Sequence, residues 1–106
     1  MNEKLRSILM ELRNRLSDLY GDRLADLILF GSQARGDAEE GSDIDVLVVL
    51  EGEVNSSAEI ERTGGFVASI CLQHDVVISC VFMDQEHYLR RNGPLLRNIR
   101  REGIAL

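Results

Sequence analysis

The chain has 106 residues, of which 44% are hydrophobic and 28% are charged, and its formal net charge is −6. These values are typical of a folded globular chain, so we expect residues 1–106 to form a single domain. The negative charge argues against direct nucleic-acid binding through a broad basic surface. No apolar stretch approaches the ~20 residues of a membrane helix, and the N-terminus is charged rather than signal-like. We therefore expect a cytoplasmic protein with no membrane partner.

The predicted elements begin with a helix over residues 3–20, in which leucine and isoleucine recur at helical spacing before Gly21. A short apolar run at residues 25–30 predicts a buried strand. The glycine-rich turn that follows leads into a short helical stretch, for which Ser32 is placed as the N-cap. This order predicts a helix that packs on a strand, followed directly by a tight corner.

Residues 43–50 predict a second strand, which is apolar on both faces after an acidic start and is therefore central in the sheet. The pattern Ser56-x-x-Glu59 is typical of a capping box and predicts the start of a second long helix. Its glycine pair, Gly64-Gly65, weakens the prediction in the middle of this helix. The residues expected to face inward from it are Ile60, Val67, Ile70 and Cys71.

Residues 75–83 predict a third strand, and residues 85–91 and 95–102 predict two short helices. About two dozen residues connect the second and third strands, which suits a parallel crossover and is too long for a hairpin. The order of elements predicts an α/β fold, with a small mixed central sheet and flanking helices. The two cysteines, Cys71 and Cys80, lie in apolar surroundings without metal-ligand spacing, and we interpret them as buried free thiols.

Charged residues are unevenly distributed along the chain. Residues 37–61 contain nine acidic residues and no lysine or arginine, whereas residues 90–101 contain five arginines and no acidic residue. An acidic segment suits divalent cations, and a basic one suits phosphate or an acidic partner. For most of these side chains, however, simple exposure to solvent is a sufficient explanation.

Two aspartates, Asp43 and Asp45, stand at the start of the second predicted strand. Side chains alternate along a strand, so both project to one face and Ile44 projects to the other. Parallel strands start at the same end of a sheet, so we expect Asp75, at the start of the third strand, to join them. The Gly31-Ser32 corner is separated from Asp43 by only ten residues and is expected at the same edge.

Three carboxylates held close together repel one another unless a cation compensates their charge. Mg²⁺ prefers carboxylate oxygens and usually takes further ligands from substrate phosphates. Gly31 permits close backbone approach, and the amide groups after it, with the Ser32 hydroxyl, suit phosphate oxygens. The sequence therefore predicts a site for magnesium and a nucleotide triphosphate at this corner of the sheet.

The stretch Gly31-Ser32, ten residues, then Asp43-Ile44-Asp45 resembles the GS-x10-DxD pattern of the nucleotidyltransferase superfamily with a DNA polymerase β-like palm. The fuller form GSQARG…SDIDVLVVL is most similar to the minimal nucleotidyltransferases, which are antitoxin partners of HEPN-domain toxins. The resemblance covers nearly the whole chain, including the ending GPLLRNIRREG. It implies a polymerase β palm-like nucleotidyltransferase fold.

For the carboxylates, the resemblance implies that Asp43 and Asp45 bind magnesium, with two ions in the site, and that these ions bridge the nucleotide phosphates. It implies that Asp75 binds the metal that activates the attacking hydroxyl. The implied reaction transfers AMP from ATP to a hydroxyl and releases pyrophosphate. For Asp75 the alternative is an aspartate that caps the start of a strand.

For the phosphates, the resemblance implies that Gly31 and Ser32 hold the β- and γ-groups of ATP. Arg35 is a further candidate for contact with the triphosphate. A surface ion pair between Arg35 and Asp37 is the alternative.

The resemblance also suggests an acceptor, namely a tyrosine of a HEPN-domain toxin, which AMPylation would silence. About 25 residues follow the third predicted strand, too few for a second domain that would grip a small substrate. One alternative is a non-catalytic antitoxin that neutralises its partner by binding. Another is a small-molecule nucleotidyltransferase in which a homo-oligomer supplies the missing wall of the site.

Overall fold

A four-stranded mixed sheet, in the order β3-β2-β1-β4, organises the chain. β1 (Leu24–Phe30) pairs antiparallel with β2 (Ile44–Leu50) and with the short β4 (Ile104–Ala105), whereas β2 pairs parallel with β3 (Ile78–Asp84). The computed structural model describes residues 1–106. The predicted α/β fold with a mixed sheet and a parallel crossover is confirmed.

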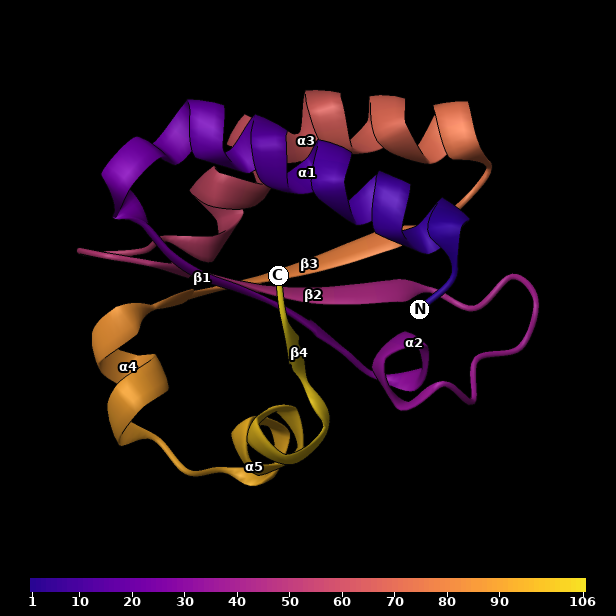
Figure 1. Cartoon of the computed structure of the whole chain (residues 1–106). Helices are drawn as coiled ribbons and strands as arrows, with labels where there is room; N and C mark the ends of the chain where they lie inside the picture. The colour runs from indigo at the N-terminus through magenta and orange to yellow at the C-terminus, as the bar shows by residue number, and fades with distance from the viewer.

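Helices cover both faces of this sheet (Figure 1). α1 (Glu3–Tyr20) and α3 (Ser56–His74) lie side by side on one face. α4 (Gln85–Arg90) and α5 (Pro94–Glu102) lie on the other face, and the short α2 (Ser32–Arg35) follows β1 at one end of the sheet. None of these helices combines the length and the apolar composition needed to span a membrane.

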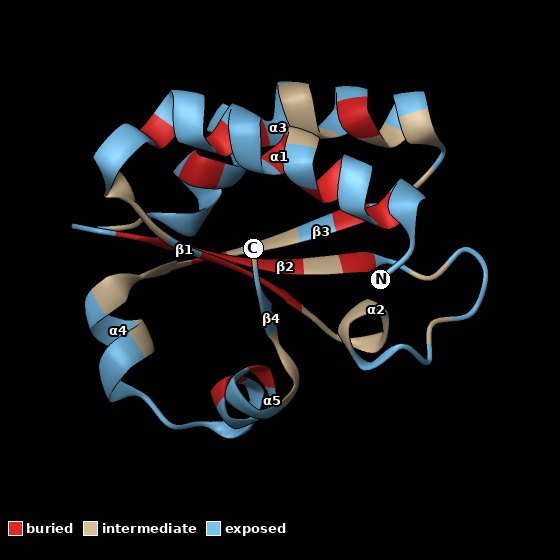
Figure 2. Ribbon diagram, viewed as in Figure 1, coloured by how far each residue is buried: buried red, intermediate tan, exposed pale blue.

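Buried side chains form one cluster on each side of the sheet, and β2 contributes to both (Figure 2). On the α1–α3 side, β2 contributes Ile44, Val46, Val48 and Leu50. The cluster on the α5 side consists of Ile28, Leu47, Val49, Leu96 and Ile99. The predicted central position of this strand is therefore confirmed. Because Asp45 shares the face of Leu47, its carboxylate belongs to the side of the sheet that α5 covers.

Two helix starts differ from the prediction. At α2 the N-cap position is occupied by Gly31, and Ser32 is the first helical residue, so the predicted N-cap is wrong by one position. At α3 the cap is Asn55, whose side chain accepts a hydrogen bond of 3.0 Å from the Ala58 N–H. The predicted cap at Ser56 is therefore wrong. Asn55, one residue earlier, accepts the hydrogen bond from a free N–H of the first helical turn that Ser56 was expected to accept.

The inward face of α3 is more polar than predicted. Glu59 is buried and accepts a hydrogen bond of 2.7 Å from the Tyr20 hydroxyl, and Thr63, one turn later, is buried as well. Burial and the neighbouring Glu59 raise the pKa of Tyr20. Ile60, predicted to face inward, is 55% exposed because these two polar residues occupy the inward positions. The helix continues through Gly64-Gly65 without a break.

The junction between α3 and β3 also differs from the prediction. β3 begins at Ile78, not at residue 75, and Asp75 is the C-cap of α3 with a φ of 53°. The Asp75 N–H donates to the carbonyl of Cys71. This left-handed conformation is more usual for glycine or asparagine, so the sequence does not reveal it.

The last strand, β4, was not predicted, because two residues are too short to show a periodic pattern. It pairs with Ile28 and Leu29 of β1, and the Leu106 N–H donates to the Leu27 carbonyl at 2.9 Å. The 3-10 turn Gly21–Arg23 joins α1 to the start of β1. The C-terminal segment thus closes the free edge of β1.

The two cysteines are free thiols, as predicted, and both are half-buried. Burial raises the pKa of the Cys80 thiol to about 12, and the nearby Cys71 adds to this shift. A thiol with so high a pKa is a poor nucleophile at neutral pH. Neither residue enters the functional argument.

The layer between α1 and the sheet can be tested with a core substitution. Leu12 in α1 is fully buried, so Leu12→Ala should lower the free energy of unfolding by about 2–5 kcal/mol in urea denaturation. The matched control is Leu72→Ala on α3, where the side chain is 84% exposed and a change below about 0.5 kcal/mol is expected. Equal losses in the two variants would contradict the packing described.

Candidate functional site

The register of β1 against β2 places Phe30 opposite Asp45, so the chain turns at Gly31 directly beside this carboxylate. Gly31 has a φ of 75°, a conformation that side chains disfavour. A Cβ atom added at this position would lie 2.5 Å from Oδ2 of Asp45, which is closer than such atoms approach. The backbone at Gly31 therefore lies directly against the Asp45 carboxylate, with no room for a side chain between them.

Directly after Gly31, the chain turns into α2. The N–H groups of Ala34 and Arg35 both donate to the Gly31 carbonyl at 3.1 Å, so the amides of Ser32 and Gln33 precede the first hydrogen bond of the helix. The corner therefore offers backbone N–H groups and the Ser32 hydroxyl beside a carboxylate. Such groups suit the oxygens of a phosphate.

Asp43 directly precedes β2 and is exposed, and Asp45, the second residue of β2, is half-buried. Burial, and then the charge of Asp43, raise the pKa of Asp45, while Arg35 acts in the opposite direction. The protein itself thus leaves part of the negative charge here uncompensated. A divalent cation would supply this compensation, and two carboxylates with a nearby hydroxyl are donors that Mg²⁺ accepts. The residues present fit that ion.

Arg35, at the end of α2, lies at the same corner. Its Nε atom is 3.3 Å from Oδ2 of Asp37, and Nη1 is 3.3 Å from Oε2 of Glu102 in α5. Hydrogen bonds to these two carboxylates raise the pKa of Arg35. The pairing with Asp37 that the sequence left open is thus present. Because a guanidinium carries five N–H donors, other donors are available to a ligand, and phosphate contact stays a prediction.

Asp75 lies outside β3, the strand that it was predicted to open. The chain holds no group of three or more Asp, Glu, His or Cys side chains arranged to bind a metal ion. Asp75 is exposed at the end of α3, and the β3 residue that pairs with Asp45 is Ser79. The prediction that Asp75 opens the third strand is wrong, and its role as a third metal ligand stays a prediction.

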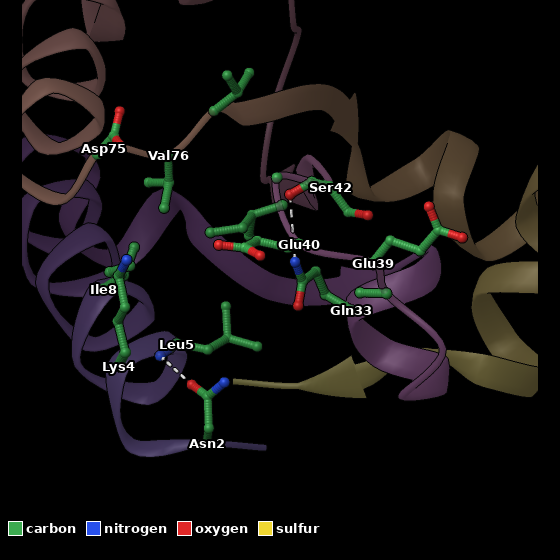
Figure 3. Close-up of a pocket in the computed structure, with 14 residues that line it drawn as sticks. Asn2, Lys4, Leu5, Ile8, Gln33, Glu39, Glu40, Ser42, Asp75 and Val76 are labelled. Atoms are coloured by element: carbon green, nitrogen blue, oxygen red, sulfur yellow. Dashed lines mark hydrogen bonds between the residues drawn. The ribbon is translucent and has the colours of Figure 1, made fainter.

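A cavity of about 660 Å³ lies beside this corner, between the start of α1, residues 38–42 and residues 75–77 (Figure 3). Ser42 and Ile44, the two neighbours of Asp43 in the chain, contribute to its lining. Asp43 itself does not line the cavity. Sequence analysis missed this cavity because three segments far apart in the chain assemble it.

Comparison with known proteins identifies relatives of this chain. Residues 9–99 match the family model described as "Nucleotidyltransferase domain". A Methanocaldococcus jannaschii protein named "Putative protein adenylyltransferase MJ0604" is 36% identical over 107 residues, a match that covers 100% of this chain and 99% of that protein. The matches thus include both the Gly31-Ser32 corner and the Asp43–Asp45 pair.

Solved structures share the fold. A crystal structure of a toxin-antitoxin with AMP-PNP aligns with a TM-score of 0.64 and 17% identity, covering 98% of this chain and 72% of that one. A structure described as a "putative minimal nucleotidyltransferase" aligns with a TM-score of 0.60 and 24% identity, covering 100% of this chain and 97% of that one. At these identities the likeness concerns the fold.

The contact between Gly31 and Asp45 can be tested against a second glycine. Gly31 (φ 75°, ψ −159°) and Gly21 (φ 54°, ψ −129°) both have a positive φ outside the left-handed helical region, so Gly31→Ala and Gly21→Ala should each cost about 1–3 kcal/mol of unfolding free energy. A Cβ at Gly21 meets open space, whereas at Gly31 it displaces the Asp45 carboxylate, so Gly31→Ala should lose more. Equal losses in urea denaturation would argue against the close approach.

The raised pKa of Asp45 predicts a pH dependence of stability. A carboxyl with a raised pKa in the folded state weakens the fold as pH rises from its unfolded pKa, ~3.9, through the folded value. Asp45→Asn should therefore have a higher urea midpoint than the parent chain at pH 7, and the difference should vanish near pH 3. Asp18→Asn, at an exposed position of α1, is the control. A lower midpoint for Asp45→Asn at pH 7 would contradict the assigned environment.

Proposed function

Since this chain belongs to the family of nucleotidyltransferase domains, we propose that it transfers AMP from ATP to a hydroxyl group of a protein. The observation that carries the proposal is the close approach of Gly31 to Asp45, which joins a phosphate-binding turn to a pair of carboxylates. The full-length relative named as a protein adenylyltransferase supports the choice of AMP and of a protein acceptor.

In this proposal, Asp43 and Asp45 hold Mg²⁺, with two ions in the loaded site. Mg²⁺, when bound, neutralises charge on the phosphates. The Ser32 hydroxyl and the amides at the start of α2 donate to phosphate oxygens, and the remaining N–H groups of Arg35 face the triphosphate. These groups position ATP so that its α-phosphorus is open to the acceptor.

The proposed transfer exchanges one phosphorus–oxygen bond for another. The acceptor oxygen forms a bond to the α-phosphorus as the bond from this phosphorus to the α,β-bridging oxygen breaks. Pyrophosphate leaves, and the proton of the acceptor hydroxyl passes to solvent or to a carboxylate. No redox change or further reactant is required.

We further propose that the acceptor is a tyrosine of a HEPN-domain toxin, so that the chain acts as an antitoxin in the cytoplasm. The sequence resemblance to minimal nucleotidyltransferases supports this partner. The shared fold with a toxin-antitoxin crystallised with AMP-PNP is consistent with it. AMPylation would silence the toxin by adding a bulky charged group to the tyrosine.

The test uses the purified chain, Mg²⁺, ATP labelled at the α-phosphate, and a purified HEPN-domain protein as the acceptor. The partner should acquire label, and Asp43→Asn or Asp45→Asn should lower the rate by about 10³-fold, because electrostatic stabilisation of the phosphates is lost. Asp18→Asn should retain the rate of the parent chain. Absence of transfer by the parent chain with either Mg²⁺ or Mn²⁺ would remove the enzymatic proposal.

Asp75 requires its own variant, because it ends α3 and is not part of β3. Asp75→Gly removes the carboxylate while permitting the left-handed backbone at the end of α3. A loss of transfer comparable to that of Asp43→Asn would mean that Asp75 joins the site when nucleotide binds. An unchanged rate would restrict the metal ligands to Asp43 and Asp45.

A second function, neutralisation of the partner by binding alone, is favoured by the lack of a third carboxylate beside the pair. The two functions differ in what Asp43→Asn does to the RNase activity of the partner. If this variant still neutralises the partner at equal stoichiometry, covering the partner is sufficient. If it fails while still binding, adenylylation is required.

A further inference from the structure

The cavity beside the Gly31-Ser32 corner has an apolar floor. Leu5 and Ile8 of α1, Ile44 of β2 and Val76 contribute to it. The volume of about 660 Å³ exceeds the needs of a few water molecules and is within the range of ligand-binding pockets. Its lining contains no aromatic side chain and no arginine, the groups on which a nucleobase would stack. An aliphatic or aromatic side chain of a ligand would bury apolar surface here.

The rim of this cavity is acidic. Glu39, Glu40 and Asp75 contribute carboxylates, against the single positive charge of Lys4. Lys4 lies in α1, Glu39 and Glu40 lie in the loop before β2, and Asp75 ends α3 (Figure 3). None of these four side chains forms a salt bridge within the chain. The rim is therefore complementary to a positive charge, while the floor is complementary to an apolar group.

The cavity lies close to the reacting centre but on the other face of β2. Ser42 and Ile44 line it, Asp43 between them does not, and the Asp45 side chain projects to the face opposite that of Ile44. An extended peptide advances ~3.3 Å per residue, so a residue two or three positions from one seated in the cavity lies about 7–10 Å away. Because Ser42 and Ile44 line the cavity and are the chain neighbours of Asp43, this reach extends from the cavity past the start of β2.

We propose that this cavity anchors the protein acceptor by one bulky apolar side chain that is adjacent to a lysine or arginine in the acceptor. The apolar side chain packs against the floor of the cavity, and the lysine or arginine lies beside Glu39 and Glu40. This binding brings the acceptor hydroxyl toward Asp43. This inference rests on the proposed function, because only that function identifies the molecule in the cavity as the acceptor. Its binding step, however, needs neither ATP nor Mg²⁺.

Titration of the ¹⁵N-labelled chain with acetyl-Leu-Arg-amide, without nucleotide or metal, tests the anchor. Amide signals of Leu5, Ile8, Ile44 and Val76 should shift. Acetyl-Gly-Arg-amide, which lacks the apolar side chain, should bind at least about fivefold more weakly. The double variant Glu39→Gln, Glu40→Gln should weaken acetyl-Leu-Arg-amide about threefold to tenfold at low salt.

A substitution that fills the cavity gives an independent test. Ala38→Trp places a bulky side chain at the lining and should abolish these shifts, whereas Ala58→Trp, at an exposed position of α3, should leave them unchanged. Thermal unfolding of both variants verifies the fold. No shifts up to about 10 mM peptide, shifts outside the cavity, or equal binding of the leucine and glycine peptides would overturn the inference. Because these readouts involve no catalysis, a failure of AMP transfer remains distinguishable from a failure of the anchor.

Discussion

The contact between the Gly31 backbone and the Asp45 carboxylate is the constraint on which the rest of the site depends. It arises because β1 and β2 run antiparallel with Phe30 opposite Asp45, so the end of one strand meets the start of the other. The positive φ of Gly31 then turns the chain into α2 without a side chain in the way. The same turn leaves the first amides of α2 and the Ser32 hydroxyl beside the carboxylate.

The layers around the sheet hold this contact in place while leaving its charge accessible. β2 is buried on both faces beyond Asp45, so the strand has no freedom to slide relative to β1. Partial burial and the neighbouring Asp43 raise the pKa of Asp45, which is the electrostatic state that a cation relieves. The salt bridge between Arg35 and Glu102 connects this corner to the end of α5, so the helices on this face also help to position the site. A site that destabilises the free chain and is completed by a ligand is common in enzymes.

The sequence predicts those parts of the fold that depend on local patterns. The helix at residues 3–20, the central strand and the parallel crossover follow from apolar periodicity and loop length. The ten-residue spacing predicts that the Gly31-Ser32 corner lies at the sheet edge where the second strand starts, but not that Gly31 contacts Asp45. The sequence does not predict the position of Asp75 at the end of α3. The apolar pattern of a strand starts directly after this residue, and nothing in the pattern indicates that Asp75 has a left-handed backbone conformation. It does not predict the cavity, whose lining comes from three distant segments, or the buried Glu59, whose partner is Tyr20 in another helix. In each case the missing information is tertiary.

The most direct test of the central claim is to locate the metal on the protein. Mn²⁺ accepts the same oxygen ligands as Mg²⁺ and broadens NMR signals of nearby amides, so it can be added to the ¹⁵N-labelled chain with a non-hydrolysable ATP analogue. Broadening should centre on the amides of Gly31, Ser32 and Asp43–Asp45 and should disappear in Asp45→Asn. Broadening that centres instead on Glu39 and Glu40, or that persists in Asp45→Asn, would contradict the account.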